Sequence, residues 1–227
     1  MDLLDRFYSR RDKSRQAGVY RLLMAKHKAV SELLAGHRLD EDESFSGIHR
    51  CYGSDASAET YFFNYKEAYD FIVSCAVVEH LADPEAALAG MIGALKPGGA
   101  MAHVIDLRDH GMFSYKWHEL KFLEVPEFLY RRMVAASGRP NRYLLPDYRD
   151  MMDGMRVETD FRVTSLAGAG RIDPSARYDS ISEATRRKST EFVRAVRGGF
   201  DPRFSAYSDE ELSVTGFVLL VRKSPNV

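Results

Sequence analysis

Apolar residues in the middle of the chain form two short runs with a helical pattern between them. The first run, YDFIVSCA at residues 69–76, has aromatic and β-branched residues and predicts a strand buried on both faces of a parallel sheet. The second run, AMAHVIDL at residues 100–107, predicts another strand. Between them, Asp83 and Pro84 predict a helix start, because the carboxylate can accept from the first helical amides and proline needs no donor there.

The helix that starts at Pro84 is predicted to end at the sequence KPGG, residues 96–99. Proline blocks helix continuation and glycine allows positive φ, so these four residues predict a turn. Strand, helix, turn and strand together predict one right-handed crossover unit over residues 69–106.

The segments around this unit alternate between helical and extended patterns. Before it, residues 16–34 predict a helix and IHRCY at 48–52 predicts a short strand. After it, the spacing of apolar residues predicts helices at 126–137, 146–154 and 181–196 and strands at 157–165 and 212–223. Gly168 and Gly170 follow one of these strands without the third glycine of a nucleotide-binding loop, so we interpret them as a loop exit.

Composition narrows the class of protein. The 227 residues are 45% hydrophobic, and this length favours a single domain, with a helical segment and acidic loop at 1–45 and a sheet core at 46–227. Lys and Arg (32) nearly balance Asp and Glu (33), so we expect no nucleic-acid or membrane partner. No apolar run approaches the about 18 residues of a membrane helix. Cys51 and Cys75 lie in apolar runs, which predicts reduced core thiols and a cytoplasmic location.

Residues 69–107 carry a family resemblance. The order of strand, EHLADP, helix, LKPGG and strand resembles the fourth strand, following helix and fifth strand of class I S-adenosylmethionine-dependent methyltransferases. A weaker likeness continues through DLRDHGMF and LYRRMVAASGRPNRYLLPDYRDMM, which resemble the substrate side of methyltransferases that act on sugars or related small molecules. The resemblance implies an α/β, Rossmann-like three-layer sandwich with a mixed sheet and an antiparallel C-terminal strand.

The chain departs from this family at its start. Family members have a glycine-rich turn after the first strand, which lets the backbone approach the donor. Residues 1–60 contain only four glycines, never two close together: Gly18, Gly36, Gly47 and Gly53. We therefore expect the first two strands to be missing and the family order to be reduced to 3-4-5-7-6. The fourth strand would then need cover from the third strand, from the N-terminal helix, or from a second chain in a homodimer or with a partner.

The resemblance also implies a donor, an acceptor and the residues that meet the donor. The donor would be S-adenosylmethionine and the acceptor a small molecule or a glycan. The residues that the resemblance places at the donor are Ser74, Ala76, Val77 and His80 around the end of the fourth strand, and Asp55 with Ala56 at the adenine.

The candidate catalytic residues follow the fifth strand, at the carboxyl edge where ligands bind in open α/β sheets. They are Asp106, Asp109 and His110, with His110 as the expected base. These three residues could also bind a metal, but three ligands within five loop residues form a loose pattern, so we expect no metal site. Glu79 and His80 could organise the turn instead of acting on a ligand.

Two further alternatives stay open. The basic runs at Arg131-Arg132 and at 186–188 are typical of solvated helix faces, with anion binding by Arg131, Arg132 or Arg139 as the alternative. The whole chain could also be a non-catalytic descendant that lost the donor site and serves as a binding or scaffolding protein.

Overall fold

The computed structural model describes residues 57–135 and 139–225. The chain divides into two compact units, residues 1–54 and 55–227, and the described residues belong to the second. Several predictions concern positions outside the described residues, namely the helix at 16–34, the strand at 48–52, Cys51, Asp55 and Ala56. The single-domain prediction for 1–227 stays a prediction.

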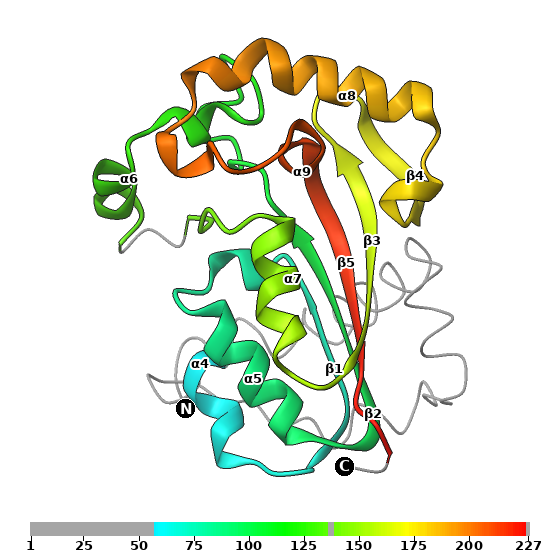
Figure 1. Cartoon of the computed structure of the whole chain (residues 1–227). Coiled ribbons are helices and arrows are strands. Elements are labelled where there is room, and N and C mark those ends of the chain that lie inside the picture. The colour runs from blue at the N-terminus through cyan, green and yellow to red at the C-terminus, as the bar shows by residue number, and fades with distance from the viewer. Residues whose placement is uncertain (1–56, 136–138, 226–227) are drawn as a thin grey trace, which may run out of the picture. The chain divides into compact units, whose positions relative to one another are not determined.

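A mixed five-stranded sheet forms the centre of the described unit (Figure 1). Its strands are β1 (Tyr69–Cys75), β2 (Leu95–Asp106), β3 (Glu158–Leu166), β4 (Gly170–Ala176) and β5 (Val214–Arg222), in the order β1-β2-β5-β3-β4. Strands β1 and β2 are parallel, whereas β5 runs antiparallel to both β2 and β3. The first four strands of this order match the predicted family strands 4-5-7-6, so the α/β class and the antiparallel C-terminal strand are confirmed.

Four of the six α-helices that the structure describes lie at predicted places, namely 84–94, 127–134, 145–153 and 183–196, and the other two were not predicted. The α-helices are α4 (Ala58–Tyr61), α5 (Pro84–Ala94), α6 (Glu127–Val134), α7 (Leu145–Asp153), α8 (Glu183–Val196) and α9 (Asp209–Ser213). The short 3-10 helices are η2 (Phe62–Asn64), η3 (Val78–His80), η4 (Lys121–Glu124), η5 (Tyr178–Ser180), η6 (Arg197–Gly199) and η7 (Pro202–Phe204). Helix α5 starts as its sequence predicts, with the Asp83 carboxylate accepting from the Ala86 amide at 2.9 Å. No helix in the described ranges is long and apolar enough to cross a membrane.

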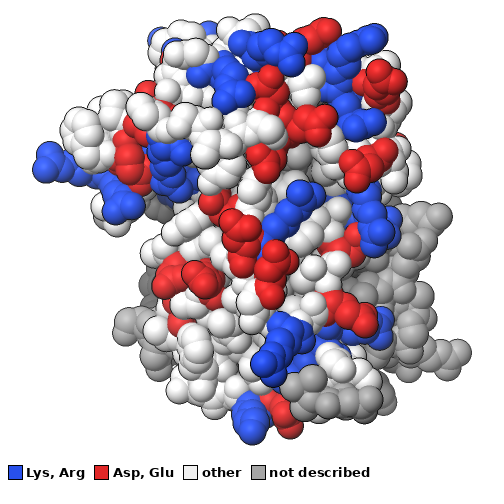
Figure 2. Space-filling model, viewed as in Figure 1, with Lys and Arg blue, Asp and Glu red and all other residues white. Residues whose placement is uncertain are grey.

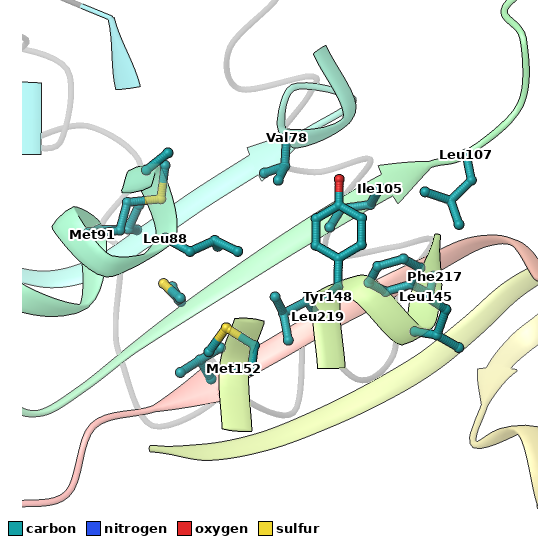
Figure 3. Close-up of a cluster of buried hydrophobic side chains, with 14 of the residues drawn as sticks. Val78, Leu88, Met91, Ile105, Leu107, Leu145, Tyr148, Met152, Phe217 and Leu219 are labelled. Carbon is teal, nitrogen blue, oxygen red and sulfur yellow. The ribbon is translucent and has the colours of Figure 1, made fainter. Parts of the chain in front are cut away.

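Helices α5 and α7 lie on one face of the sheet and enclose its main core (Figure 1). Figure 3 shows Leu88 of α5 and Met152 and Tyr148 of α7 lying toward Ile105 of β2 and Phe217 of β5. All five side chains are at most 2% exposed. Burying each such apolar side chain contributes about 1.5–3 kcal/mol, so this layer fixes how α5 and α7 lie on the sheet.

Strand β1 is not buried on both faces, contrary to the prediction from its apolar run. Among the described residues it pairs with β2 alone, and only Ile72 of its seven residues is buried. Val73 is 41% exposed. Cys75 is exposed as well, so the prediction of a core thiol is wrong for this cysteine. The apolar run therefore forms a strand with one buried position rather than a central strand.

Two local features also differ from the sequence prediction. Residues 96–99 lie within β2, where they enlarge the spacing between the pairs Tyr69–Leu95 and Phe71–Ala100 instead of forming a separate turn. Gly98 has the expected positive φ, at 76°. Residues after Gly168 form strand β4, which the sequence analysis did not predict because GRIDPSA is polar and contains proline.

Gly99 allows the chain to approach β1 closely. A Cβ at this position would lie 2.9 Å from the Lys96 carbonyl oxygen and 3.1 Å from the Asp70 carbonyl oxygen, and backbone atoms cannot move aside cheaply. We expect Gly99→Ala to lower the free energy of unfolding by about 1–3 kcal/mol, as overpacking does. Chemical denaturation of the purified variant measures this change.

Gly93 offers the matched control. It is an exposed position in α5, and a Cβ there would meet nothing within 4 Å. Gly93→Ala should therefore raise the free energy of unfolding, by up to about 1 kcal/mol, through helix propensity. Equal effects of the two substitutions would contradict the close approach at Gly99.

Candidate functional site

Two connections meet at the carboxyl ends of β1 and β2. The chain leaves β1 into η3, and it leaves β2 into a loop over residues 107–114. Each exit contains a non-glycine residue with left-handed backbone, Ala76 at φ 53° and His110 at φ 50°. Such conformations cost free energy, and they occur preferentially at functional sites.

Glu79 of η3 is the buried centre of this edge. Its side chain is 1% exposed, and Oε1 accepts a hydrogen bond from the Asp106 amide at 3.2 Å. Burial raises the pKa of Glu79 to about 7, although the backbone hydrogen bonds act in the opposite direction. The same Oε1 lies 3.9 Å from Nε2 of His110. Glu79 therefore joins the two connections, which agrees with the turn-organising role that its place in the sequence allows.

Asp106 and His110 lie together at the rim of this edge. Arg108 donates to both carboxylate oxygens of Asp106, through Nε at 2.8 Å and Nη2 at 2.6 Å. Burial raises the pKa of Asp106, but the hydrogen bonds and charge of Arg108 outweigh it and leave the pKa below its ordinary value. His110 Nε2 lies 3.7 Å from Asp106 Oδ2. An ionised carboxylate beside an imidazole can orient the ring or accept a proton.

Asp109 lies in the same loop but is fully buried. Its carboxylate accepts from the amides of Gly111 at 3.0 Å, Phe113 at 2.6 Å and Ser114 at 2.7 Å, and from the Ser114 hydroxyl at 2.6 Å. These four bonds hold the loop together. They leave Asp106 and His110 as the catalytic candidates with accessible side chains.

His80 belongs to the same cluster, and Asn141 positions it. The rings of His80 and His110 meet edge to face, with centroids 4.8 Å apart. Asn141 donates through its backbone amide to the Glu79 carbonyl at 2.5 Å and through Nδ2 to the Leu81 carbonyl at 3.0 Å. Asn141 could not be found from the sequence. It lies 60 residues after Leu81 in the chain, and no local pattern marks which distant side chain will contact the turn.

The other expected donor residues line the end of β1. The Ser74 hydroxyl forms a 2.8 Å hydrogen bond with Nδ1 of His103. Ala76 donates its amide to the Val104 carbonyl at 2.9 Å, and Val77 is 40% exposed. Ser74, Ala76 and Val77 therefore lie at the same sheet edge as the cluster and directly precede η3 in the chain. His103 is fully buried.

Two cavities border the cluster. One, of about 280 Å³, is lined by Asp106, Arg108, Asp109, His110, Gly111, Ser114 and Glu119. The other, of about 650 Å³, includes His80 and Asn141 together with four arginines and one glutamate, namely Arg131, Arg139, Arg142, Arg203 and Glu127. A third cavity, of about 430 Å³ around Arg149 and Asp160, contains none of the expected site residues. On the face shown in Figure 2, both signs of charge are interspersed, so the arginine-rich lining is a local feature.

Burial lowers the pKa of His103 to about 4, so the folded protein holds this histidine neutral. In the unfolded chain the residue binds its proton near pH 6.5. The folded state therefore loses up to about 3 kcal/mol of stability as the pH falls from about 6.5 to about 4, and keeps it in full above that window. Chemical denaturation at pH 7 and pH 4 measures the loss.

One substitution separates this contribution from those of other titrating groups. His103→Asn should reduce the difference in unfolding free energy between pH 7 and pH 4 relative to the parent chain. An unchanged pH dependence in His103→Asn would contradict a neutral buried His103.

Part of the chain matches the model of a known protein family. Residues 23–153, more than half of the chain, match the family model described as a methyltransferase domain. Among curated proteins, none matched the chain.

Solved structures give more distant likenesses. They include an S-adenosylmethionine-dependent methyltransferase from Archaeoglobus fulgidus, with 12% identity, coverage of 98% of this chain and 100% of that chain, and a TM-score of 0.42. YcgJ from Bacillus subtilis has 12% identity, coverage of 87% and 77%, and a TM-score of 0.42. Phosphoethanolamine N-methyltransferase 2 from Haemonchus contortus, in complex with S-adenosyl-L-methionine, has 12% identity and a TM-score of 0.39, with coverage of 75% of this chain and 36% of that one. The family assignment rests on the family model alone.

Proposed function

The chain belongs to a family of methyltransferase-domain proteins, and from this membership we propose that it transfers a methyl group from S-adenosylmethionine to a small-molecule or glycan acceptor. One observation carries the proposal. Glu79, Asp106 and His110 meet at the carboxyl edge of the parallel pair β1 and β2, where open α/β sheets bind their ligands.

Methyl transfer requires no covalent bond between the protein and the methyl group. An acceptor atom attacks the methyl carbon in line with the departing sulfur, so catalysis consists of positioning, with removal of the acceptor's proton where it carries one. We assign removal of that proton to His110 or Asp106. Nε2 of His110 and Oδ2 of Asp106 lie 3.7 Å apart at the rim of the cluster. The donor would lie at the end of β1 against Ser74, Ala76, Val77 and His80, with Asp55 and Ala56 at its adenine.

The cavity of about 650 Å³ supports the acceptor class. It borders His80 and is large enough for a sugar-sized molecule. Four of its lining side chains are arginines and Glu127 is its one acidic side chain among the lining residues described, so a negatively charged group on the acceptor would be favoured. Glu127 forms ion pairs with Arg131, Arg142 and Arg203, which leaves the lining net positive.

Donor binding tests the proposal directly. We expect the full-length chain to bind S-adenosylhomocysteine saturably with a Kd below about 1 mM in titration calorimetry, a free energy of at least about 4 kcal/mol. Val77→Arg should weaken this binding about tenfold or more, because a large side chain would fill the donor position at the end of β1. Val73→Arg is the control, since Val73 on β1 is equally exposed, at 41% against 40% for Val77.

The same titration also tests a second function, that of a non-catalytic protein. Residues 1–60 contain no closely spaced glycines, and this observation favours a non-catalytic binding or scaffolding protein. Each charge-assisted contact to the donor that is lost costs about 1.5–3 kcal/mol, so a few losses would abolish useful affinity. Absence of binding at millimolar ligand would contradict methyl transfer and leave the non-catalytic alternative. Equal binding by the parent chain and Val77→Arg would instead contradict only the position of the donor.

The exposed side of β1 supports a further part of the proposal, association with a second copy or a partner chain. Val73 and Val77 are both about 40% exposed on or next to a strand that pairs, within the described residues, with β2 alone. An unprotected apolar edge strand tends to pair with another chain. We expect sedimentation velocity at micromolar concentration to give the mass of a dimer. A single-chain mass across that range would contradict association between copies.

A further inference from the structure

Three side chains that commonly bind metals come together where η3 meets the loop after β2. One ligand atom from each of Glu79, His80 and His110 lies within 4.8 Å of the corresponding atoms of the other two. Glu79 and His80 are neighbours in the chain, whereas His110 comes from the other connection. The group is therefore made by the parallel pairing of β1 and β2, and it differs from the loop pattern of Asp106, Asp109 and His110 that the sequence offered.

Two atoms of this group lack hydrogen-bond partners. Oε2 of Glu79 and Nε2 of His110 are buried, and neither forms a hydrogen bond with any residue that the structure describes. The Glu79 side chain is 1% exposed. A buried carboxylate oxygen without a partner is costly, and a bound cation would remove that cost.

Charge in the surroundings is consistent with a cation. Glu79 Oε1 lies 3.9 Å from His110 Nε2, and Asp106 Oδ2 lies 3.7 Å from the same nitrogen. Arg108 holds Asp106 through two hydrogen bonds, so Asp106 lies beside the group rather than within it. Two carboxylates thus lie within 4 Å of the same His110 nitrogen, and a dication placed there would be attracted by both.

We propose that Glu79, His80 and His110 form a binding site for a divalent transition-metal ion, with Zn²⁺ as the expected occupant. Two imidazole nitrogens and one carboxylate oxygen suit Zn²⁺ and similar ions, whereas Mg²⁺ and Ca²⁺ prefer sets made of oxygen atoms. Three protein ligands leave a coordination position for water or a substrate oxygen. Metal–ligand bonds of about 2.0–2.1 Å require the three atoms to approach to about 3.3 Å, a movement that rotation of the two half-buried rings can supply.

The surrounding structure holds two of the ligands in place. Asn141 bonds to the backbone on both sides of His80, at the Glu79 and Leu81 carbonyls. Asp109 folds the loop that carries His110 through its hydrogen bonds to Gly111, Phe113 and Ser114. Such outer contacts orient metal ligands and raise metal affinity.

Metal binding changes which residue can remove the acceptor's proton. With an ion on its nitrogen, His110 is a ligand and cannot also act as the base, which leaves Asp106 for that role. The inference goes beyond the proposed methyl transfer and does not depend on it, because the site needs neither donor nor acceptor.

The test uses the full-length chain without an affinity tag, stripped of metal by a chelator and then titrated with ZnCl₂ by calorimetry. We expect one Zn²⁺ per chain, with no heat from MgCl₂ at the same concentrations. Titration with CoCl₂ should add the visible absorption bands of Co²⁺ bound by nitrogen and oxygen ligands. His110→Ala should weaken Zn²⁺ binding by at least about 100-fold, more than the loss of an outer contact would, and should remove the cobalt bands.

Two further variants complete the design. His118→Ala is the matched control, because His118 is also half-buried beside a carboxylate, that of Glu124, but lies outside the group. It should keep both signals. Glu79→Gln keeps the shape of the side chain and should weaken binding as His110→Ala does, so the proposal stays testable if one variant fails to fold, as judged by circular dichroism.

Three results would overturn the inference: no Zn²⁺ binding by the parent chain, equal affinity in the parent and in His110→Ala, or equal binding of Mg²⁺ and Zn²⁺. The donor titration described above is run with a chelator present. Each test can therefore fail without the other.

Discussion

The parallel pairing of β1 with β2 is the constraint on which the candidate site depends. Parallel strands place their carboxyl ends at the same edge, so the connections that follow them must meet there. Helix α5 makes this possible within 11 residues, since it starts on the Asp83 cap directly after η3 and leads straight into β2 at Leu95. The register from Ile72–Met101 to Cys75–Val104 then brings η3 against the loop that carries His110.

The same constraint explains why the site contains buried polar groups. Glu79 lies between the two connections and bonds to the backbone of Asp106, so it is removed from water by the pairing itself. Its raised pKa follows from that position. A carboxylate in such a place stabilises the fold little by itself, because desolvation offsets its hydrogen bond.

Much of the fold could be predicted from sequence, because its signals are local. The Asp83-Pro84 start of α5 and the positive φ of Gly98 depend on neighbouring residues and were correctly expected. Strand β4 was missed because an edge strand needs no apolar run. Its backbone pairing with β3 holds it in the sheet although its sequence is polar. The burial of β1 was overestimated for the opposite reason. An apolar run shows that a strand can be covered on both faces, but its neighbours decide whether it is.

The candidate site was less predictable, and Asp106 and Asp109 show why. Asp106 is the last residue of β2 and Asp109 follows three residues later, and no pattern of residue types distinguishes the two. The backbone turns directly after Asp109, where His110 and Gly111 both have positive φ. That turn directs the amides of Gly111, Phe113 and Ser114 onto Asp109. The path leaves Asp106 with Arg108 at the rim and brings His110 to Glu79. The role of each carboxylate thus depends on a backbone path that residue types alone do not encode. The same path gives His110 two carboxylate neighbours, Asp106 from its own part of the chain and Glu79 from the opposite connection.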